Sequence, residues 1–402
     1  MDHIFSPVLE RWERWPNLIN LTTLHDQFGN TWRLTDEGKI ERATAKKTTD
    51  WQEIAGPVDK NERAWQTLFA DPEGLIWVSD GQQWFRHNPR QANTGWLEAI
   101  PAEETQDGPW RLAAPLPCGN HDIFATEQDG TLYIAGGLTH YRGYPPRNHV
   151  FDELYAYDIA ADTWRTVSRM PHPRCYNGIA TLEDRIWIVG GSANLREPEN
   201  PDGPRDPLNT VVIYNPVSAQ WADGPPLHTA RIEPIVATVA GRMYAAGGGD
   251  LDGELLDSVE SIGPGESAWQ MEPSLPVPMR QFAGCVLNDC LYICGKAGGF
   301  AYDPNKKTWD QLPAMPTDPP QAPLVAAHKE AMWVIGGYKT DAVWRYHPQE
   351  KKWVEAPRLP TAQSWGAAWS LQGQLMAIGG AHWSEALEVF IFDDRVFILE
   401  ET

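Results

Sequence analysis

The chain lacks an excess of basic residues and lacks long apolar runs. Its 33 Lys+Arg against 54 Asp+Glu give a formal net charge of −21, and no basic run is long enough to override that field locally. A strongly negative protein repels phosphate backbones and acidic lipid headgroups, so we expect no nucleic-acid partner and no membrane partner. No apolar stretch in the sequence approaches the roughly 18 residues that a membrane-spanning helix needs.

The N-terminus lacks the features of a secretory signal. The segment MDHIFSPVLERWERW has acids and arginines where a signal peptide has a positive start and then an apolar core. The sequence therefore predicts a soluble, cytoplasmic protein. A mature chain from which a signal peptide had been removed would look the same, and such a protein would be secreted or periplasmic.

Cysteine is scarce and shows no metal-binding spacing. The chain has 5 cysteines, an odd number, with no Cys-x-x-Cys pair. Cys285, Cys290 and Cys294 fall on one predicted hairpin, where buried free thiols are the usual outcome and a metal or disulfide is the less favoured alternative. We therefore expect no disulfide framework, no metal site and no cofactor.

What the chain does contain is a repeat. Five short apolar runs end in a double glycine: LYIAGG (132–137), IWIVGG (186–191), MYAAGG (243–248), MWVIGG (332–337) and LMAIGG (375–380). Turns such as YNP (214–216) and YDP (302–304) follow them. Tryptophans recur downstream of such runs at a similar period, at Trp164, Trp221, Trp269, Trp309 and Trp353. A unit of roughly 40 to 57 residues with these markers is typical of a radial array of small four-stranded sheets.

These motifs resemble the kelch repeat, and residues 110–400 are assigned to kelch-like blades. The resemblance implies an all-β propeller in which the tryptophans fill the wedge between neighbouring blades. Residues 20–100 lack the double glycine but repeat internally, because DQFGNTWRLTDEGKIER (26–42) aligns with DPEGLIWVSDGQQWFRH (71–87). This half resembles the two-component-regulator type of propeller repeat and is expected to form two degenerate blades.

We therefore expect a single propeller domain over residues 1–402. Counting second strands favours eight blades, with seven as the runner-up. Residues 8–16, which include WERWP (12–16), are expected to close the ring against the C-terminal blade, since a closed ring leaves no free sheet edge. Trp110 and the terminal RVFIL find no place in this scheme.

Side chains for a binding site are expected where each first strand begins. Counting back from each glycine turn gives one equivalent position per blade, with the register open by one residue at 280 and 321: Asn120, Arg174, Arg231, Arg280, Gln321 and Gln363. Arginines around one axis in a negative molecule suit a carboxylate, phosphate or sulfate, which guanidinium grips through paired donors. The alternative is that these arginines pair with carboxylates of the blades, such as Glu233.

A second set lies two positions further along and should point the same way, because side chains alternate along a strand. Its members are Asp122, Tyr176, Glu233, Phe282 and Trp365. Acid, phenol and aromatic faces beside arginine suit an acidic sugar, with simple lining of the central channel as the alternative. Trp365 is the expected stacking platform, and Tyr176 and Glu233 are candidates for proton transfer.

The longest loops, at 138–155 and 192–209, are expected to serve as binding loops on the same face. From the first of them we expect Arg142 and Tyr144 to contact the ligand. His121 and His140 are candidate general acids or bases. His121, His140 and His149 could together hold a metal, but their spacing follows no fixed motif.

The chain is similar to the sialic-acid mutarotases in two stretches, NHVFDELYAYD (148–158) and GGSANLREPENPDGPRD (190–206). That resemblance implies an arginine-lined pocket and an acid/base pair that opens and recloses a sugar ring. Ser192 stands where those enzymes carry a glutamate, so Glu197 or Glu233 would have to substitute.

Three functions remain open. The favoured hypothesis is binding of an anionic sugar-like ligand on the loop face, with or without mutarotase- or epimerase-like isomerisation. One alternative is a uronate polysaccharide lyase, in which Arg174 neutralises the carboxylate while His121 or Tyr176 moves the proton, with His140 as partner. The other alternative is a kelch-type scaffold that binds a protein partner on the loop face.

Overall fold

The computed structural model describes residues 108–117, 119–141, 147–193, 206–250, 252–384 and 389–400, and, before residue 99, the strands β1 to β10 with Thr35 and Lys39. The chain divides into two compact units. The first consists of Met1–Thr105 with His140–His149, and the second of Gln106–Thr139 with Val150–Thr402.

The first unit contains two four-stranded antiparallel sheets. One has the order β3 (Thr23–His25), β4 (Thr31–Leu34), β5 (Ile40–Ala43) and β6 (Gln52–Glu53). The other has the order β7 (Thr67–Ala70), β8 (Ile76–Ser79), β9 (Trp84–His87) and β10 (Leu97–Glu98). A further pair in this unit is β1 (His3–Ser6) with β2 (Arg11–Arg14). The pair of β14 (Leu138–Tyr141) with β15 (Arg147–Val150) has residues in both units. Trp32 on β4 is fully buried, with the guanidinium of Arg42 above its ring.

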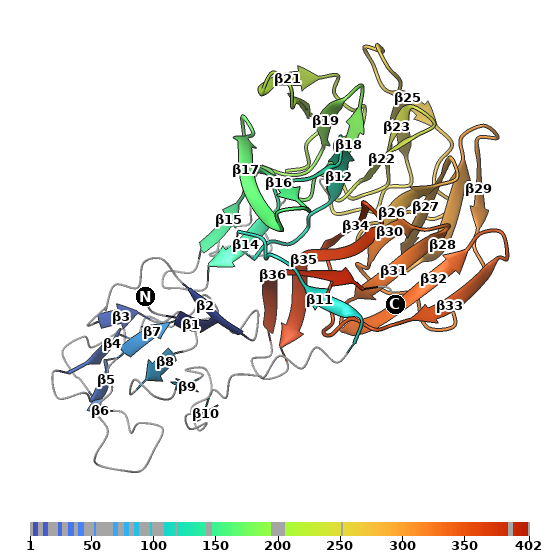
Figure 1. Ribbon diagram of the computed structural model, residues 1–402. Coiled ribbons are helices and arrows are strands. Elements are labelled where there is room, and N and C mark those ends of the chain that lie inside the picture. Colours follow the sequence, from blue (N-terminus) through green and yellow to red (C-terminus); the bar gives the residue numbers. More distant parts are fainter. Residues whose placement is uncertain are drawn as a thin grey trace. The chain divides into compact units, whose positions relative to one another are not determined.

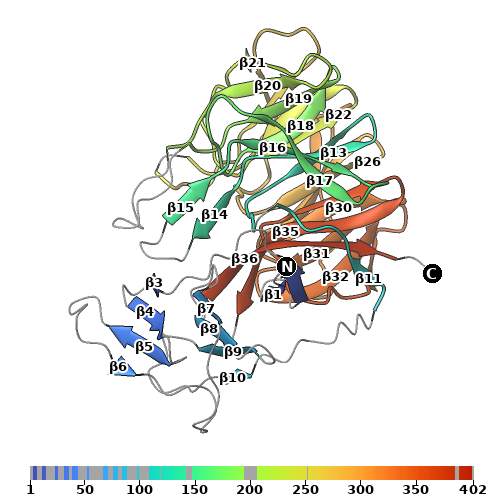
Figure 2. The same cartoon turned by 60° about the vertical axis from the view of Figure 1, so that its left-hand side comes forward.

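The second unit is a ring of four-stranded blades (Figure 1; Figure 2). Blade 1 is β12 (Ala125–Gln128), β13 (Thr131–Ala135), β16 (Glu153–Asp158) and β17 (Thr163–Arg169). Blade 2 is β18 (Gly178–Leu182), β19 (Arg185–Val189), β20 (Val211–Asn215) and β21 (Gln220–Gly224). Blade 3 is β22 (Ile235–Val239), β23 (Arg242–Ala246), β24 (Val259–Ile262) and β25 (Gln270–Glu272).

The remaining blades follow in chain order. Blade 4 is β26 (Ala283–Leu287), β27 (Cys290–Gly295), β28 (Gly298–Asp303) and β29 (Thr308–Gln311). Blade 5 is β30 (Leu324–His328), β31 (Ala331–Gly337), β32 (Thr340–His347) and β33 (Lys352–Ala356). Blade 6 is β34 (Ala367–Leu371), β35 (Gln374–Ser384), β36 (Val389–Leu399) and, as its outermost strand, β11 (Trp110–Leu112).

The all-β propeller expected from the repeat is confirmed, but the expected count of eight or seven blades is not. Within the described residues of the second unit, the inner strands contact one another in a closed cycle, β12, β18, β22, β26, β30, β34 and back to β12. One buried apolar cluster fills each of the six interfaces between neighbouring blades. The ring therefore closes with six blades, and whether the first unit belongs to the same domain stays a prediction.

The outer strand of the last blade differs from the prediction. Residues 11–14 pair with β1, whereas β36 takes β11 as its outer neighbour, with Trp110 opposite Leu399 and Leu112 opposite Phe397. A strand from before the first blade thus completes the last one, which removes the free edge of blade 6.

The tryptophans bind each blade to the one before it, as expected. Indole Nε1 donates to a carbonyl of the preceding blade or its connection in four of the five predicted units, while Trp221 donates to Ser168 Oγ. Trp110 donates in the same way to Pro357 O at 2.9 Å. Trp110 is therefore the tryptophan of blade 6.

Double glycines end the second strands because the chain turns there against the neighbouring blade. In blade 3, Gly247 has φ +60°, and a Cβ at this position would lie only 2.9 Å from the carbonyl oxygen of Met279, on the segment that leads into blade 4. Glycine is the residue that allows both the left-handed backbone and the close approach.

Candidate functional site

One face of the ring gathers the starts of the first strands and the connections from second to third strands; we call it the loop face. In blade 2, for example, Cys175 before β18 bridges to Ser192 after β19. Immediately before each first strand, one non-glycine residue has a left-handed backbone, with φ between 50° and 56°: Asp122, Tyr176, Glu233, Gln281, Ala322 and Trp365. We call these six residues the axial ring.

Backbone hydrogen bonds tie the axial ring together from blade to blade. The Trp365 carbonyl accepts the Asp122 N–H, and the Ala322 carbonyl accepts the Trp365 N–H. The same bond joins Ala322 N–H to the Gln281 carbonyl, and Glu233 N–H to the Tyr176 carbonyl. Left-handed non-glycine residues are strained and persist where the surroundings hold them, often at binding sites.

Four of the five residues predicted for this position lie in the axial ring. The fifth, Phe282, does not; its side chain is buried in the cluster between blades 3 and 4. Gln281 takes the position instead.

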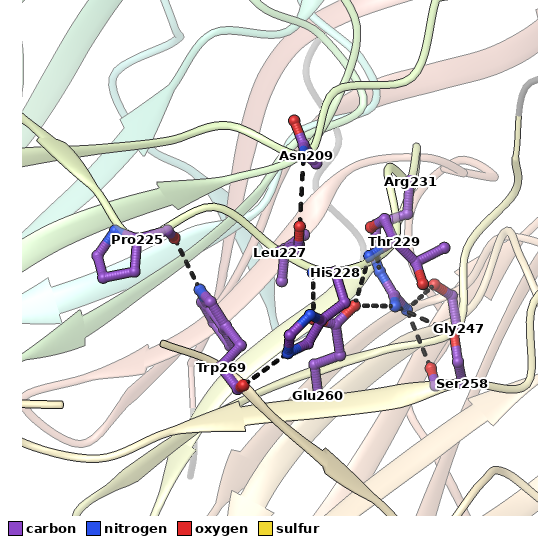
Figure 3. Close-up of polar contacts among 10 residues, drawn as sticks. All are labelled: Asn209, Pro225, Leu227, His228, Thr229, Arg231, Gly247, Ser258, Glu260 and Trp269. Atoms are coloured by element: carbon purple, nitrogen blue, oxygen red, sulfur yellow. Dashed lines mark hydrogen bonds and ion pairs between the residues drawn. The ribbon is translucent and has the colours of Figure 1, made fainter. Parts of the chain in front are cut away.

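Arg231 is held entirely inside its blade (Figure 3). Its guanidinium makes five hydrogen bonds, to the carbonyls of Thr229, Gly247 and Ser258, to Ser258 Oγ and to Glu260 Oε1. Burial lowers the pKa of Arg231, and Glu260 opposes that shift. The alternative of pairing with a blade carboxylate thus holds for Arg231, with Glu260 as the partner in place of Glu233.

Arg174 occupies the same position one blade earlier. It donates to the carbonyls of Gly190 and Thr210 and to Thr210 Oγ1, and burial lowers its pKa to about 10. Asn120 likewise donates to the carbonyl of Gly136. Each of these side chains binds the first glycine of its own double glycine, and Gln363 is fully buried at the corresponding place. A ligand-binding role for Asn120, Arg174, Arg231 and Gln363 stays a prediction. It gains no support from the first three, whose side-chain N–H groups bind carbonyls of their own blades.

Arg280 and Gln321 lie one residue beyond that position, and this corrects the register. Gly191 N–H binds the Arg231 carbonyl, and in the next blade Gly248 N–H binds Met279, not Arg280. Within blade 5, Tyr338 N–H binds the Gln321 carbonyl as Gly249 N–H binds that of Ile232 within blade 3, so Gln321 corresponds to Ile232, the residue after Arg231.

The two displaced residues are more accessible than the buried set. Arg280 is half-buried, and among the described residues its guanidinium has no hydrogen bond and no ion pair. Gln321 Nε2 donates to Gln281 Oε1 at 2.7 Å and so joins the axial ring.

The predicted acid–base residues come together in part. His121 Nδ1 lies 2.6 Å from Asp122 Oδ2, and the imidazole stacks on Phe392 at 4.1 Å. Asp122 and Glu233 line one small axial pocket of about 20 Å³, and Tyr176 lies in the same ring. Below this pocket, an axial channel of about 440 Å³ runs between the inner strands.

Some predicted residues fall outside the part of the chain that can be placed. His140 lies on β14 and His149 on β15, but their side chains are outside the described residues. Arg142 and Tyr144 lie outside them altogether, as does Glu197.

Sequence reasoning missed an aromatic cluster at the edge of the axial ring. Tyr338 packs against Trp365 and Phe390, with ring centroids 6.0 and 5.5 Å away. Phe390 also contacts Trp383, and the Lys339 ammonium lies 3.9 Å above the Trp383 ring. We call these five side chains the aromatic cluster. Tyr338 is 40% exposed, so the cluster offers a ring face to solvent.

A charged network in blade 6 was also missed. Asp393 is fully buried on β36, binds Arg395 through both carboxylate oxygens and lies 2.9 Å from His382 Nδ1. Burial alone would raise the pKa of Asp393, but Arg395 and His382 outweigh it and hold that pKa well below its ordinary value.

On the loop face, the connections from second to third strands are shortest in blades 4 and 5. There the second and third strands are joined by two residues each, Lys296–Ala297 and Tyr338–Lys339. Lys296 and Lys339 are exposed, and Arg280 lies in the same sector. We call this part of the loop face the cationic sector, after these three side chains, in a molecule of net charge −21.

Among the described residues, no group of three or more His, Cys, Asp or Glu is arranged to hold a metal ion. That part of the chain also contains no helix of the length and apolarity needed to cross a membrane. Among the described residues, Cys175, Cys285, Cys290 and Cys294 are not joined in disulfide bonds.

Comparison with known proteins agrees with the fold. The kelch motif family matches residues 124–171 and 173–228. Kelch-like protein 35 of Mus musculus is 26% identical over 211 residues, which cover 52% of this chain and 33% of that protein. Kelch repeat and BTB domain-containing protein 12 of Danio rerio is 30% identical over 174 residues, covering 41% of this chain and 28% of that protein. The chain thus spans about a third of the length of these curated relatives.

Among solved structures, one described as the structure of YjhT matches with a TM-score of 0.57 and 15% identity. The match covers 71% of this chain and 99% of that one. A likeness at this identity concerns the fold. With the six-blade ring, the glycine turns and the matched motifs together, the chain is a kelch-repeat β-propeller.

Proposed function

We propose that the loop face binds a small ring-shaped ligand that carries an acidic group, such as a uronic acid or a related sugar acid. The observation that carries this proposal is that the aromatic cluster and Arg280, which has no partner among the described residues, are linked on the loop face through Gln321. Its amide donates to Gln281, the neighbour of Arg280, and its carbonyl accepts the Tyr338 N–H. Sugar rings stack on aromatic faces, and a guanidinium grips a carboxylate through two parallel hydrogen bonds.

The axial ring supplies the polar contacts that such a ligand needs. Asp122 and Glu233 accept hydrogen bonds from hydroxyl groups, and the Gln281 amide can donate or accept. The small axial pocket holds about one water-sized group, since a water needs roughly 10–15 Å³. The ligand therefore lies across the ring, with one substituent in the pocket and its acidic group toward Arg280.

Isomerisation at this site would be a proton transfer. Glu233 takes the proton from the anomeric hydroxyl while the ring carbon–oxygen bond breaks, and the His121–Asp122 pair gives a proton to the ring oxygen. Closure on the opposite face of the carbonyl reverses both transfers, so that Glu233 returns its proton to the carbonyl oxygen and His121 regains its own. The sequence similarity to the sialic-acid mutarotases supports this chemistry, as does the position of Glu233 in the axial pocket.

Thermal-shift titration tests the binding step. D-glucuronate at about 100 times its dissociation constant should stabilise the fold by about 2.7 kcal/mol, and D-glucose should not match it. The Arg280→Ala variant should lose most of the shift, whereas Gln311→Ala, on the exposed outer strand of blade 4, should keep it. An unchanged shift in Arg280→Ala would remove Arg280 from the site.

A protein partner is the second candidate. An acidic loop would present a carboxylate to Arg280 as a sugar acid does, and the exposed ring of Tyr338 is a suitable contact for it. The kelch-like relatives support this alternative. The absence of any shift with sugar acids, together with binding of an aspartate-rich peptide that Arg280→Ala abolishes, would favour it.

A further inference from the structure

Phe124 separates the two cavities on the axis. It directly precedes β12 of blade 1 and lines both the small axial pocket and the larger axial channel. Gly366 is the other residue that the two linings share, and it has no side chain. The ring of Phe124 is therefore the side chain that stands between them.

The contacts of Phe124 show that its ring reaches across the axis. It packs against the apolar cluster between blades 1 and 2, as expected for a residue of blade 1. It also packs against the cluster between blades 3 and 4, to which blade 1 is not a neighbour. A side chain that touches both clusters spans the opening at this level.

The other blades leave this level open. The residues two positions after the axial ring are smaller than phenylalanine: Gly178, Ile235, Ala283, Leu324 and Ala367. Below them the channel is lined largely by alanines and threonines, among them Ala180, Ala237 and Ala326. One aromatic ring from blade 1 is thus what divides a cavity that the other inner strands would leave continuous.

We propose that Phe124 is a specificity-determining residue that sets how deep a ligand can reach from the loop face. This inference rests on the proposed function, since it concerns a ligand bound at the axial ring. With Phe124 in place, the site accepts a ring with a small substituent and excludes an apolar tail directed along the axis. Without it, the channel of about 440 Å³ becomes part of the site.

Calorimetric titration with methyl and hexyl β-D-glucuronide tests this proposal. The wild-type protein should bind the two within about 2-fold of each other, since the tail finds no cavity. Phe124→Ala should bind the hexyl compound at least roughly 10-fold more tightly than the methyl compound, because each buried methylene favours binding. Val286→Ala, which enlarges the channel alone, is the matched control and should behave as wild type. A hexyl preference in the wild type, or none in Phe124→Ala, would overturn the proposal.

A second measurement does not depend on any sugar. Crystals of Phe124→Ala under xenon pressure should show xenon at the vacated position, continuous with the channel, whereas wild-type crystals should show it in the channel alone. If Phe282 or Trp365 filled the position vacated in Phe124→Ala and kept the two cavities separate, Phe124 would not be the residue that limits the depth of the site. If no variant binds either glucuronide, the proposed function fails and the xenon result still decides the role of Phe124. Should Phe124→Ala not fold, Phe124→Leu should show a smaller preference for the hexyl compound and weaker xenon density at the vacated position.

Discussion

Arg231 and Arg280 belong to successive repeats, and Arg280 lies one residue after the position that corresponds to Arg231. Their environments are opposite. Arg231 is fully buried, with each of its N–H groups bound to an acceptor in its own blade. Arg280 is half-buried and, among the described residues, unpaired. A buried guanidinium with all donors occupied stabilises a blade, whereas an unpaired one at the surface is available to a ligand.

This contrast predicts opposite effects of mutation. Arg231→Ala should lower the free energy of unfolding by about 3–5 kcal/mol, because it leaves Glu260 charged and buried without its partner. Arg280→Ala should change it by less than about 0.5 kcal/mol, as surface substitutions do. Urea unfolding of the two variants under the same conditions measures both values. Similar losses in the two would contradict the assignment of Arg231 to the blade and Arg280 to the site.

Asp393 predicts a pH dependence of stability. Its pKa is lower in the folded protein than in the unfolded chain, so its contribution is complete above the unfolded value of about 4. The contribution is lost as pH falls from about 4 through the folded pKa. Asp393→Asn should therefore be less stable than wild type at pH 7 and lose less stability on acidification to pH 3. Parallel urea midpoints at the two pH values would refute this role.

At the scale of the strand, the position of β11 in the sequence does not indicate the blade to which it belongs. Trp110 donates to a proline carbonyl after the preceding blade in the ring, as Trp269, Trp309 and Trp353 do. Its strand, however, precedes blade 1 in sequence and completes blade 6 in space. A repeat count along the chain therefore leaves Trp110 without a unit, although its chemistry is that of the others.

Removal of Trp110 should weaken the closure of the ring. Trp110→Ala should cost about 3–5 kcal/mol, as expected for a fully buried indole between blades 5 and 6. Trp110→Phe keeps most of the packing and loses the bond to Pro357, so it should cost about 1 kcal/mol. Thermal unfolding of both variants separates packing from hydrogen bonding. A cost below about 1 kcal/mol for the alanine variant would argue against closure by β11.

The second strands and their glycine turns could be predicted because each repeats the same backbone requirement. The register at Arg280 and Gln321 could also have been read from the glycines. Asn120, Arg174, Arg231 and Gln363 each lie 16 residues before the first glycine of their turn. The same count from Gly295 and Gly336 reaches Met279 and Pro320, so the predicted Arg280 and Gln321 are the polar neighbours one residue later.

Contacts between non-equivalent segments leave no repeat signal. Lys339 on the turn of blade 5 meets Trp383 on the long hairpin of blade 6. His382, Asp393 and Arg395 meet because β35 and β36 extend to 11 residues each, beyond the length of the other blades' strands. Such features depend on the lengths of individual connections, and no periodic pattern in the sequence encodes them.

At the scale of the whole molecule, the net charge of −21 opposes the local cations of the proposed site. Repulsion by the net charge acts on an approaching anion over a longer distance than the attraction of Arg280 and Lys339, and salt screens interactions beyond the Debye length of about 8–10 Å most strongly. Association of D-glucuronate should therefore become faster, by about 2-fold, between 20 and 200 mM salt, whereas a neutral glucoside should show no change. Stopped-flow tryptophan fluorescence, with Trp365 at the mouth, reports the rate. A rate that falls with salt would show that the cationic sector dominates the field at long range, and the ligand would then be steered toward the site despite the net charge.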